Sequence, residues 1–187
     1  MKERKETINI ATANVVSIGI LLISAIVLYA IFFMIYDSRD WFNEETRDSM
    51  VDNFVTSYLK FMVVLVVGII VHELIHGLTW GLYAKSKFKS ISFGVMWKML
   101  TPYCHCSEPL KVPHYAIGAL MPLITLGLIP AVVAICLGSL FWLNMSIIFI
   151  AAAAGDIMVV WKLRKENRNN MILDHPTEAG YLVYEEE

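Results

Sequence analysis

The stretch that decides the fold is VHELIHGLTW, residues 71–80. His72, Glu73 and His76 stand there in a run that is otherwise apolar enough to lie in lipid. An ionisable side chain near the centre of a bilayer costs about 2.5–3.5 kcal/mol even on the most lenient scale. Three such groups persist at that depth only where they have partners, so the stretch predicts a polar site inside a membrane helix bundle.

The composition supports a membrane protein. The chain has 187 residues, of which 57% are hydrophobic and 17% charged. A soluble domain has about 45–50% apolar and about 25% charged residues. The length allows one domain of a few membrane spans, over residues 1–187, without a separate soluble catalytic unit. A net charge of -2 and the lack of a basic, aromatic-rich groove give no indication of a nucleic-acid partner.

Four segments meet the requirement of roughly 20 apolar residues for crossing a bilayer. The first has no small-residue cleavage site at its end, so we expect a retained helix and not a signal peptide. The sequence therefore predicts an all-α membrane protein with four transmembrane helices and a loosely held polar tail at 166–187. The predicted spans are about 12–36, 54–84, 114–138 and 140–161.

Charge in the connecting segments predicts the topology. The N-terminal MKERKE, the segment 85–113 and the residues after the fourth span are rich in lysine and arginine, whereas 37–53 is acidic. Cytoplasmic loops carry the excess of basic residues. Both termini and 85–113 are therefore expected in the cytoplasm.

Residues 87–112 do not follow a helical pattern. Apolar side chains alternate with other residues from 91 to 99, a period of two that is typical of a strand. Thr101 and Pro102 then interrupt the run, and a second short extended piece follows. We expect a short β-hairpin at the cytoplasmic face, between the second and third helices.

The spacing of the polar residues at 72–76 indicates zinc chemistry. On a helix the rings of His72 and His76 lie on one face about 6 Å apart, and Glu73 lies about 100° round, beside the remaining coordination position. Zinc lowers the pKa of its bound water from 15.7 to about 7, and an adjacent carboxylate takes the proton and delivers it to a leaving amine. One catalytic Zn²⁺ is predicted, with Glu73 as base. The alternatives are a hydrogen-bonded polar cluster or a haem or quinone ligand pair.

A catalytic zinc usually has three protein ligands. Asp156, the acidic residue of the fourth span, is our choice for the third. With a rise of 1.5 Å per residue, His76 lies about 13 Å below Lys85 and Asp156 about 9 Å below Lys162, so both fall in the cytoplasmic half. Small residues at 151–155 allow close helix approach there. The other candidates for this ligand are His105, Glu108 and His114.

The segment YCHCSEPL, residues 103–110, has two interpretations. Its Cys104-His105-Cys106 run lacks the C-x-x-C spacing of a structural zinc site and is a poor disulfide framework, so we expect free thiols. The residues are either solvated polar strand residues or the lining of the site's mouth. In the second case the strand holds a substrate in extended form through main-chain hydrogen bonds, and His105 and Glu108 are candidate substrate-binding residues.

Together these features resemble a known family. HELIHG in the second span, YCHCSEPL before the third, AGD in the fourth and the DHPTEAGYLVYE tail are similar to small bacterial membrane proteins described as zincin peptidases. The likeness runs from about 60 to 184. That family is similar in layout to site-2 intramembrane metalloproteases, although the acid stands here in GDI and not in L-D-G.

The resemblance implies that His72, His76 and Asp156 bind zinc, that Glu73 is the catalytic base, and that the hairpin lies near the substrate. It also implies a bacterial cell membrane as the location. The leading hypothesis is a zinc-dependent membrane-embedded endopeptidase of the H-E-x-x-H type. It cuts membrane or membrane-adjacent proteins near the cytoplasmic face, through zinc-activated water. The alternative is a non-catalytic membrane scaffold that zinc stabilises.

Overall fold

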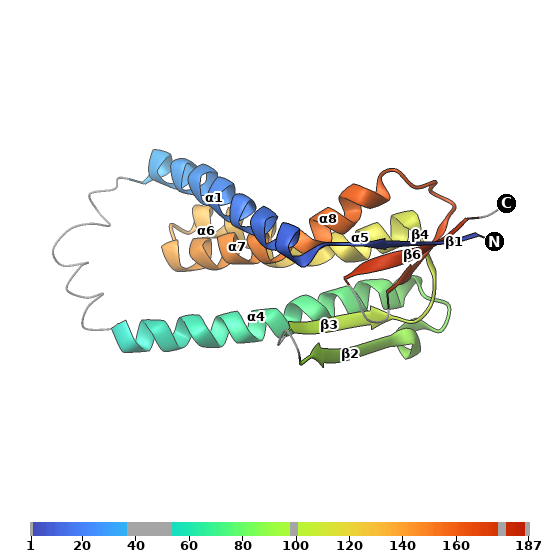
Figure 1. Cartoon of the computed structure of the whole chain (residues 1–187). Coiled ribbons are helices and arrows are strands. Elements are labelled where there is room, and N and C mark those ends of the chain that lie inside the picture. Colours follow the sequence, from blue (N-terminus) through green and yellow to red (C-terminus); the bar gives the residue numbers. More distant parts are fainter. Residues whose placement is uncertain (1, 37–53, 98–100, 176–178, 186–187) are drawn as a thin grey trace.

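The computed structural model (Figure 1) describes residues 2–36, 54–97, 101–175 and 179–185. Most of these residues are helical, as predicted. The helices are α1 (Ile10–Ile35), α4 (Phe54–Tyr83), η1 (Lys87–Ser90), α5 (Val112–Pro122), η2 (Leu123–Leu128), α6 (Ile129–Cys136), α7 (Leu140–Ala152) and α8 (Ala154–Leu163).

Three helical stretches are long and apolar enough to cross a membrane. They are α1, α4 and the continuous run α5–η2–α6, which match the first three predicted spans. The predicted fourth span is a broken one, because α7 and α8 meet at an angle of 43°. The described residues therefore hold three candidate spans, or four where the bent pair counts as one. The acidic segment 37–53, which entered the topology prediction, lies outside the described residues.

The third stretch contains a π-helical turn between Pro122 and Pro130. Pro122 ends α5, η2 is the π-helical turn, and Pro130 lies in the first turn of α6. A proline has no N–H to donate, and its ring crowds the carbonyl four residues earlier. Because Pro130 acts in this way on Leu126, the regular α-helical pattern is interrupted within η2.

The break between α7 and α8 determines where Asp156 lies. Ala153 joins the helices with φ -76° and ψ 9°, so Asp156 falls in the first turn of α8. The hydroxyl of Ser17 on α1 donates a hydrogen bond of 2.9 Å to the carbonyl of Ala151 beside the break. Such side-chain donors satisfy backbone groups that a break leaves open inside a membrane.

Two small antiparallel sheets lie at one end of the bundle (Figure 1). The predicted hairpin is confirmed as β2 (Ile91–Met96) paired with β3 (Thr101–Cys106). The other sheet has the order β1-β6-β5-β4. It joins the N-terminus to the tail, and was not expected from the all-α description. Its strands are β1 (Lys2–Thr7), β4 (Leu110–Lys111), β5 (Met171–Asp174) and β6 (Gly180–Glu185).

The tail is thus ordered, in contrast to the expectation of a loosely held segment. Strands β5 and β6 pair with each other, and β6 also pairs with β1. Buried side chains from the sheet, α4, α5 and α8 form one apolar cluster that fixes this end of the bundle. Its members include Trp80, Tyr115, Leu163, Ile172, Tyr181 and Val183.

Candidate metal centre

His72 and His76 face the same side of α4. They are one helical turn apart, both are buried, and their Nε2 atoms lie 3.2 Å from each other. The polar residues do not interrupt α4, because Phe54–Tyr83 is one continuous helix. The sequence-based expectation that the two rings lie on one helix face is met.

Asp156 completes a group of three. Its Oδ2 atom lies 3.2 Å from Nε2 of His72, and its Oδ1 atom lies 3.4 Å from Nε2 of His76. Each residue offers one ligand atom, and these atoms all lie within 4.8 Å of one another. The first turn of α8 therefore brings the acid of the broken fourth stretch against the H-E-x-x-H motif of α4.

This spacing fits a zinc ion. In a tetrahedral site with metal–ligand bonds of about 2.0–2.1 Å, neighbouring ligand atoms are about 3.3–3.4 Å apart. The Nε2 atoms of His72 and His76 are 3.2 Å apart, and each lies 3.2–3.4 Å from a different oxygen of Asp156, Oδ2 for His72 and Oδ1 for His76. With one ligand atom taken from each residue, all three atoms lie within 4.8 Å of one another. Two imidazoles and one carboxylate also form the kind of three-ligand set that catalytic zinc sites use. The residues can hold the metal and leave one coordination position open.

Helix α5 orients the ring of His76. The Nδ1 atom of His76 lies 2.9 Å from the carbonyl oxygen of Gly118. Since a carbonyl only accepts, Nδ1 carries the proton, and in the neutral ring Nε2 then presents its lone pair towards His72 and Asp156. Metal-binding histidines commonly have their second nitrogen fixed in this way.

Trp80 supports this arrangement from the next turn of α4. Its ring stacks on His76 with centroids 5.0 Å apart, and its indole N–H donates to the carbonyl of Tyr115 at 3.0 Å. A Cβ atom on Gly118 would lie only 2.0 Å from Nε1 of Trp80, so α5 approaches this closely because residue 118 is glycine. We did not predict either residue. The one sequence signal was the position of Trp80, four residues after His76.

Glu73 lies between the histidines and the hairpin. Its side chain is half-buried and interacts electrostatically with His72, His76 and Asp156. The main-chain amide of Cys104 on β3 donates a hydrogen bond to its carboxylate. Strand β3 therefore holds the carboxylate next to His72, His76 and Asp156, the candidate metal-binding group.

The hairpin packs on α4 one turn after Glu73. Gly77 leaves the space for this contact, because a Cβ atom there would lie 2.6 Å from Cζ of Phe93 and 2.9 Å from Cγ2 of Ile91. Both side chains belong to β2. The glycine in HELIHG thus allows the hairpin to lie against the helix face that carries Glu73.

Comparison with protein families gives one match. The family model described as "Putative zincin peptidase" matches residues 65–171, more than half of the chain. The chain belongs to this family. The matched range contains Glu73, the three grouped residues and the hairpin. Comparison with curated proteins gave no match, and comparison with solved structures gave none.

The other histidines named as possible ligands of this zincin-family chain have different partners. Nδ1 of His105 lies 3.1 Å from Oδ2 of Asp174, and this hydrogen bond raises the pKa of His105. The hydroxyl of Tyr115 donates to Oδ1 of the same aspartate at 2.9 Å. His114 stacks on Tyr83 with ring centroids 4.2 Å apart. His105 thus connects the hairpin to the tail strand β5.

Glu108 lies at the end of α4. Its carboxylate accepts hydrogen bonds from the main-chain amides of Lys85 at 2.8 Å and Ser86 at 3.2 Å, and those from Ser86 lower its pKa. Lys85 is about 13 Å further along the helix direction than His76. The structure therefore gives Glu108 a role in closing the turn after α4. Its predicted part in substrate binding stays a prediction.

The thiols of the hairpin do not join the metal-binding group. Cys104 and Cys106 are buried and free, and Cys136 is exposed and free, as predicted. Burial raises the pKa of both hairpin thiols. Among the described residues, the group of ligand atoms close enough to share a metal ion contains His72, His76 and Asp156 and neither thiol.

Proposed function

We propose that this protein is a zinc-dependent membrane endopeptidase. It hydrolyses peptide bonds of membrane or membrane-adjacent proteins near the cytoplasmic face. The observation that carries the proposal is the convergence of His72, His76 and Asp156, whose ligand atoms lie within 4.8 Å of one another, with Glu73 beside them. Membership of a family described as zincin peptidases supports it.

The side chains of the site have two roles, metal binding and proton transfer. His72, His76 and Asp156 hold the metal and leave one position open. When bound, zinc supplies a Lewis acid that polarises the scissile carbonyl and brings the pKa of water from 15.7 to about 7. Glu73 accepts a proton from the attacking water and later gives it to the amine that leaves when the C–N bond breaks.

The hairpin is positioned to present the substrate. The amide of Cys104 that holds Glu73 lies on the β3 edge facing α4. A substrate strand that adds to this edge offers a carbonyl to the amide and releases the carboxylate for proton transfer. Exposed apolar side chains on and beside β2, among them Phe93, Val95 and Trp97, suit an apolar peptide segment.

The location follows from charge and hydropathy. Three or four apolar helical stretches anchor the chain in a bilayer. The basic N-terminus and the basic residues after α8 favour a cytoplasmic position for both termini and for the sheets beside them. In this orientation the metal-binding group lies in the cytoplasmic half of a bacterial cell membrane, a layout similar to that of site-2 metalloproteases.

A non-catalytic scaffold is the second candidate, and one contact favours it. Because Glu73 accepts a hydrogen bond from the hairpin, it has a structural partner that needs no catalysis. In that case zinc serves to tie α4 to α8, and Glu73 only fixes the hairpin.

Glu73→Gln separates the two functions. A glutamine keeps an oxygen that accepts from Cys104 but cannot take a proton from water. The endopeptidase proposal expects unchanged zinc content and loss of cleavage by about 10²–10⁴-fold. Since the substrate is unidentified, the measurement compares newly formed protein N-termini in membranes that contain the wild type or the variant. Equal fragment yields with equal zinc content would refute Glu73 as the base.

A further inference from the structure

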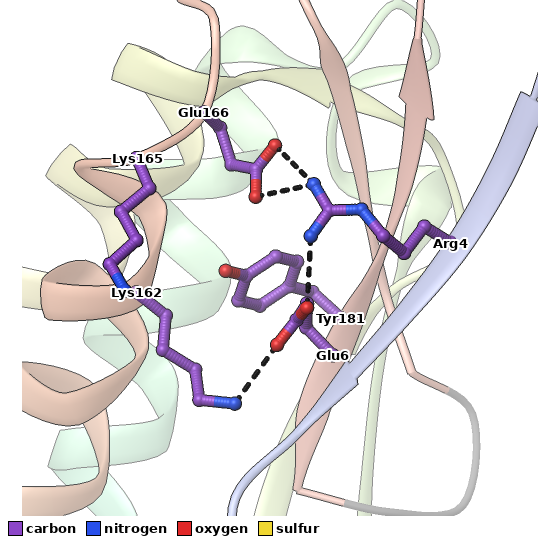
Figure 2. A pocket seen from close by; sticks show the side chains of 6 residues that line it. All are labelled: Arg4, Glu6, Lys162, Lys165, Glu166 and Tyr181. Carbon is purple, nitrogen blue, oxygen red and sulfur yellow. Dashed lines mark hydrogen bonds and ion pairs between the residues drawn. The ribbon is translucent and has the colours of Figure 1, made fainter.

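A second polar site lies where α8 leaves the bundle (Figure 2). It is a pocket of about 380 Å³ between β1, β6 and the end of α8. None of its residues belongs to the metal-binding group. The pocket is lined by Arg4, Glu6, Lys162, Lys165, Glu166 and Tyr181.

Four of these side chains pair with one another and form a fixed frame. Nη2 of Arg4 donates to both carboxylate oxygens of Glu166 at 2.7 Å, and Nη1 of Arg4 donates to Glu6 at 2.9 Å. Nζ of Lys162 donates to the other oxygen of Glu6 at 3.0 Å. The hydrogen bond from Lys162 lowers the pKa of Glu6, so its carboxylate is charged at neutral pH. The frame ties β1 to α8.

Two groups of the pocket have no such partner. The Tyr181 side chain is fully buried, and among the described residues its hydroxyl has no hydrogen-bond partner. Figure 2 shows this hydroxyl pointing into the space between Glu166 and the lysines. Lys165 is exposed, and the ion pairs found around the pocket among the described residues do not include its ammonium group. A buried hydroxyl without a partner is costly, and an acceptor oxygen of a ligand in the pocket would satisfy it.

The charge and the hydrogen-bond donors of the lining residues favour an anion as the ligand. Three cationic and two anionic side chains give the six lining residues one net positive charge. Burial raises the pKa of Tyr181, so its hydroxyl keeps its proton and can donate. An ammonium and a hydroxyl that both donate suit the several acceptor oxygens of a phosphate group.

The residues around the pocket are typical of the level of the lipid headgroups. Trp161 near the end of α8 is 61% exposed, and the guanidinium of Arg164 lies 3.3 Å from the centroid of its ring. Tryptophan with flanking basic residues is typical of the membrane–water interface. Basic pockets at this level of membrane helices bind anionic lipid headgroups.

The geometry points to a phosphate-binding site in this pocket, with Lys165 and Tyr181 as the donors to the phosphate oxygens. The phosphate belongs to an anionic phospholipid headgroup or is free in the cytoplasm. The inference does not depend on proteolysis.

The test measures thermal unfolding of the full chain in a neutral detergent. Short-chain phosphatidylglycerol, phosphatidylcholine with the same acyl chains, and inorganic phosphate are titrated separately. The variants are Lys165→Ala and Tyr181→Phe, and Lys89→Ala is the matched control. Lys89 is an exposed lysine of η1 that does not line the pocket. Tyr181→Phe removes only the unpartnered hydroxyl, so it is expected to fold without ligand at least as stably as the wild type.

We expect phosphatidylglycerol to raise the unfolding midpoint saturably, and to do so more strongly than phosphatidylcholine, whose choline cation offsets the charge of its phosphate. Each pocket variant should raise the ligand concentration at half-saturation at least about tenfold, as expected for loss of a hydrogen bond to a charged group. Lys89→Ala should leave this concentration unchanged. The same pattern with inorganic phosphate supports the site and assigns it to the free anion. A phosphatidylglycerol response that survives unchanged in both pocket variants, or the absence of any response to phosphatidylglycerol and to inorganic phosphate, would overturn the inference.

Discussion

The Nε2 atom of His72 on α4 lies 3.2 Å from Oδ2 of Asp156 on α8. This contact joins the H-E-x-x-H helix to the first turn after a 43° break. A straight fourth helix would direct the acid differently, so the break at Ala153 is part of the site's construction.

Two glycines near the metal-binding group should respond in opposite ways to alanine. In Gly118→Ala the new Cβ meets the indole of Trp80, which stacks on His76. We expect a loss of about 1–3 kcal/mol of stability, as for an overpacked core, together with weaker zinc binding. Thermal unfolding and zinc titration measure the two effects.

Gly155→Ala is the matched control. Although this glycine directly precedes Asp156, a Cβ there has no atom within 4 Å. Alanine is a better helix former than glycine, so the variant should be unchanged or more stable by up to about 1 kcal/mol, with normal zinc affinity. If Gly155→Ala lost zinc while Gly118→Ala kept it, the assigned support of His76 by α5 would be wrong.

Gly77→Ala should separate substrate presentation from metal binding. The added Cβ collides with Phe93 and Ile91 of β2, which displaces the hairpin from α4. We expect zinc content near the wild-type value and a marked loss of cleavage, read from the same membrane N-termini. Unchanged cleavage would show that the contact between β2 and α4 does not position the substrate.

The metal-binding group could be predicted because its signals are local. His72 and His76 stand one helical turn apart in an apolar segment, and Asp156 is the acidic residue of another. The hairpin was also predictable, since its alternation of apolar residues extends over 91–99. The partner of Nδ1 of His76 was not, because the carbonyl of Gly118 carries no sequence signal.

The four-stranded sheet was missed for a different physical reason. Strand β1, KERKET, has no apolar alternation, and it is held by backbone pairing with β6 from the far end of the chain. Its side chains add long-range ion pairs, such as Arg4 with Glu166. Pairing between distant segments depends on the rest of the fold, so the sequence of β1 does not indicate a strand by itself.

The pair of His105 and Asp174 should make stability depend on pH. The hydrogen bond to Asp174 raises the pKa of His105 above its ordinary value of 6.5. A raised folded-state pKa adds stability that is complete below the unfolded pKa and is lost as pH rises through the folded pKa. The unfolding midpoint of the wild type should therefore exceed that of His105→Gln most at about pH 5.5 and less at about pH 8.

His114→Gln provides the control for this measurement, because the ring of His114 stacks on Tyr83 and has no carboxylate partner among the described residues. Its difference from the wild type should not follow the same pH course. A difference between wild type and His105→Gln that grows as pH rises would contradict the assigned pair.

The proposed orientation predicts which cysteine reacts from outside the cell. Cys136 is exposed at the end of α6, where Tyr36 at the end of α1 donates to the carbonyl of Ile135. This end lies opposite the sheets (Figure 1). A membrane-impermeant maleimide added to intact spheroplasts should label the wild type and not Cys136→Ser. Labelling only after the membrane is permeabilised would show that the bundle has the opposite orientation.

The central claim is that His72, His76 and Asp156 bind one zinc and leave one position open. Zinc analysis and zinc-edge X-ray absorption of the purified full chain test it most directly. We predict one zinc per chain, with nitrogen and oxygen ligands at about 2.0–2.2 Å and no sulfur at about 2.3 Å. Zinc should be lost in Asp156→Ala and retained in Asp174→Ala. A chain without zinc, a thiolate ligand, or four ligands all from the polypeptide would contradict the account.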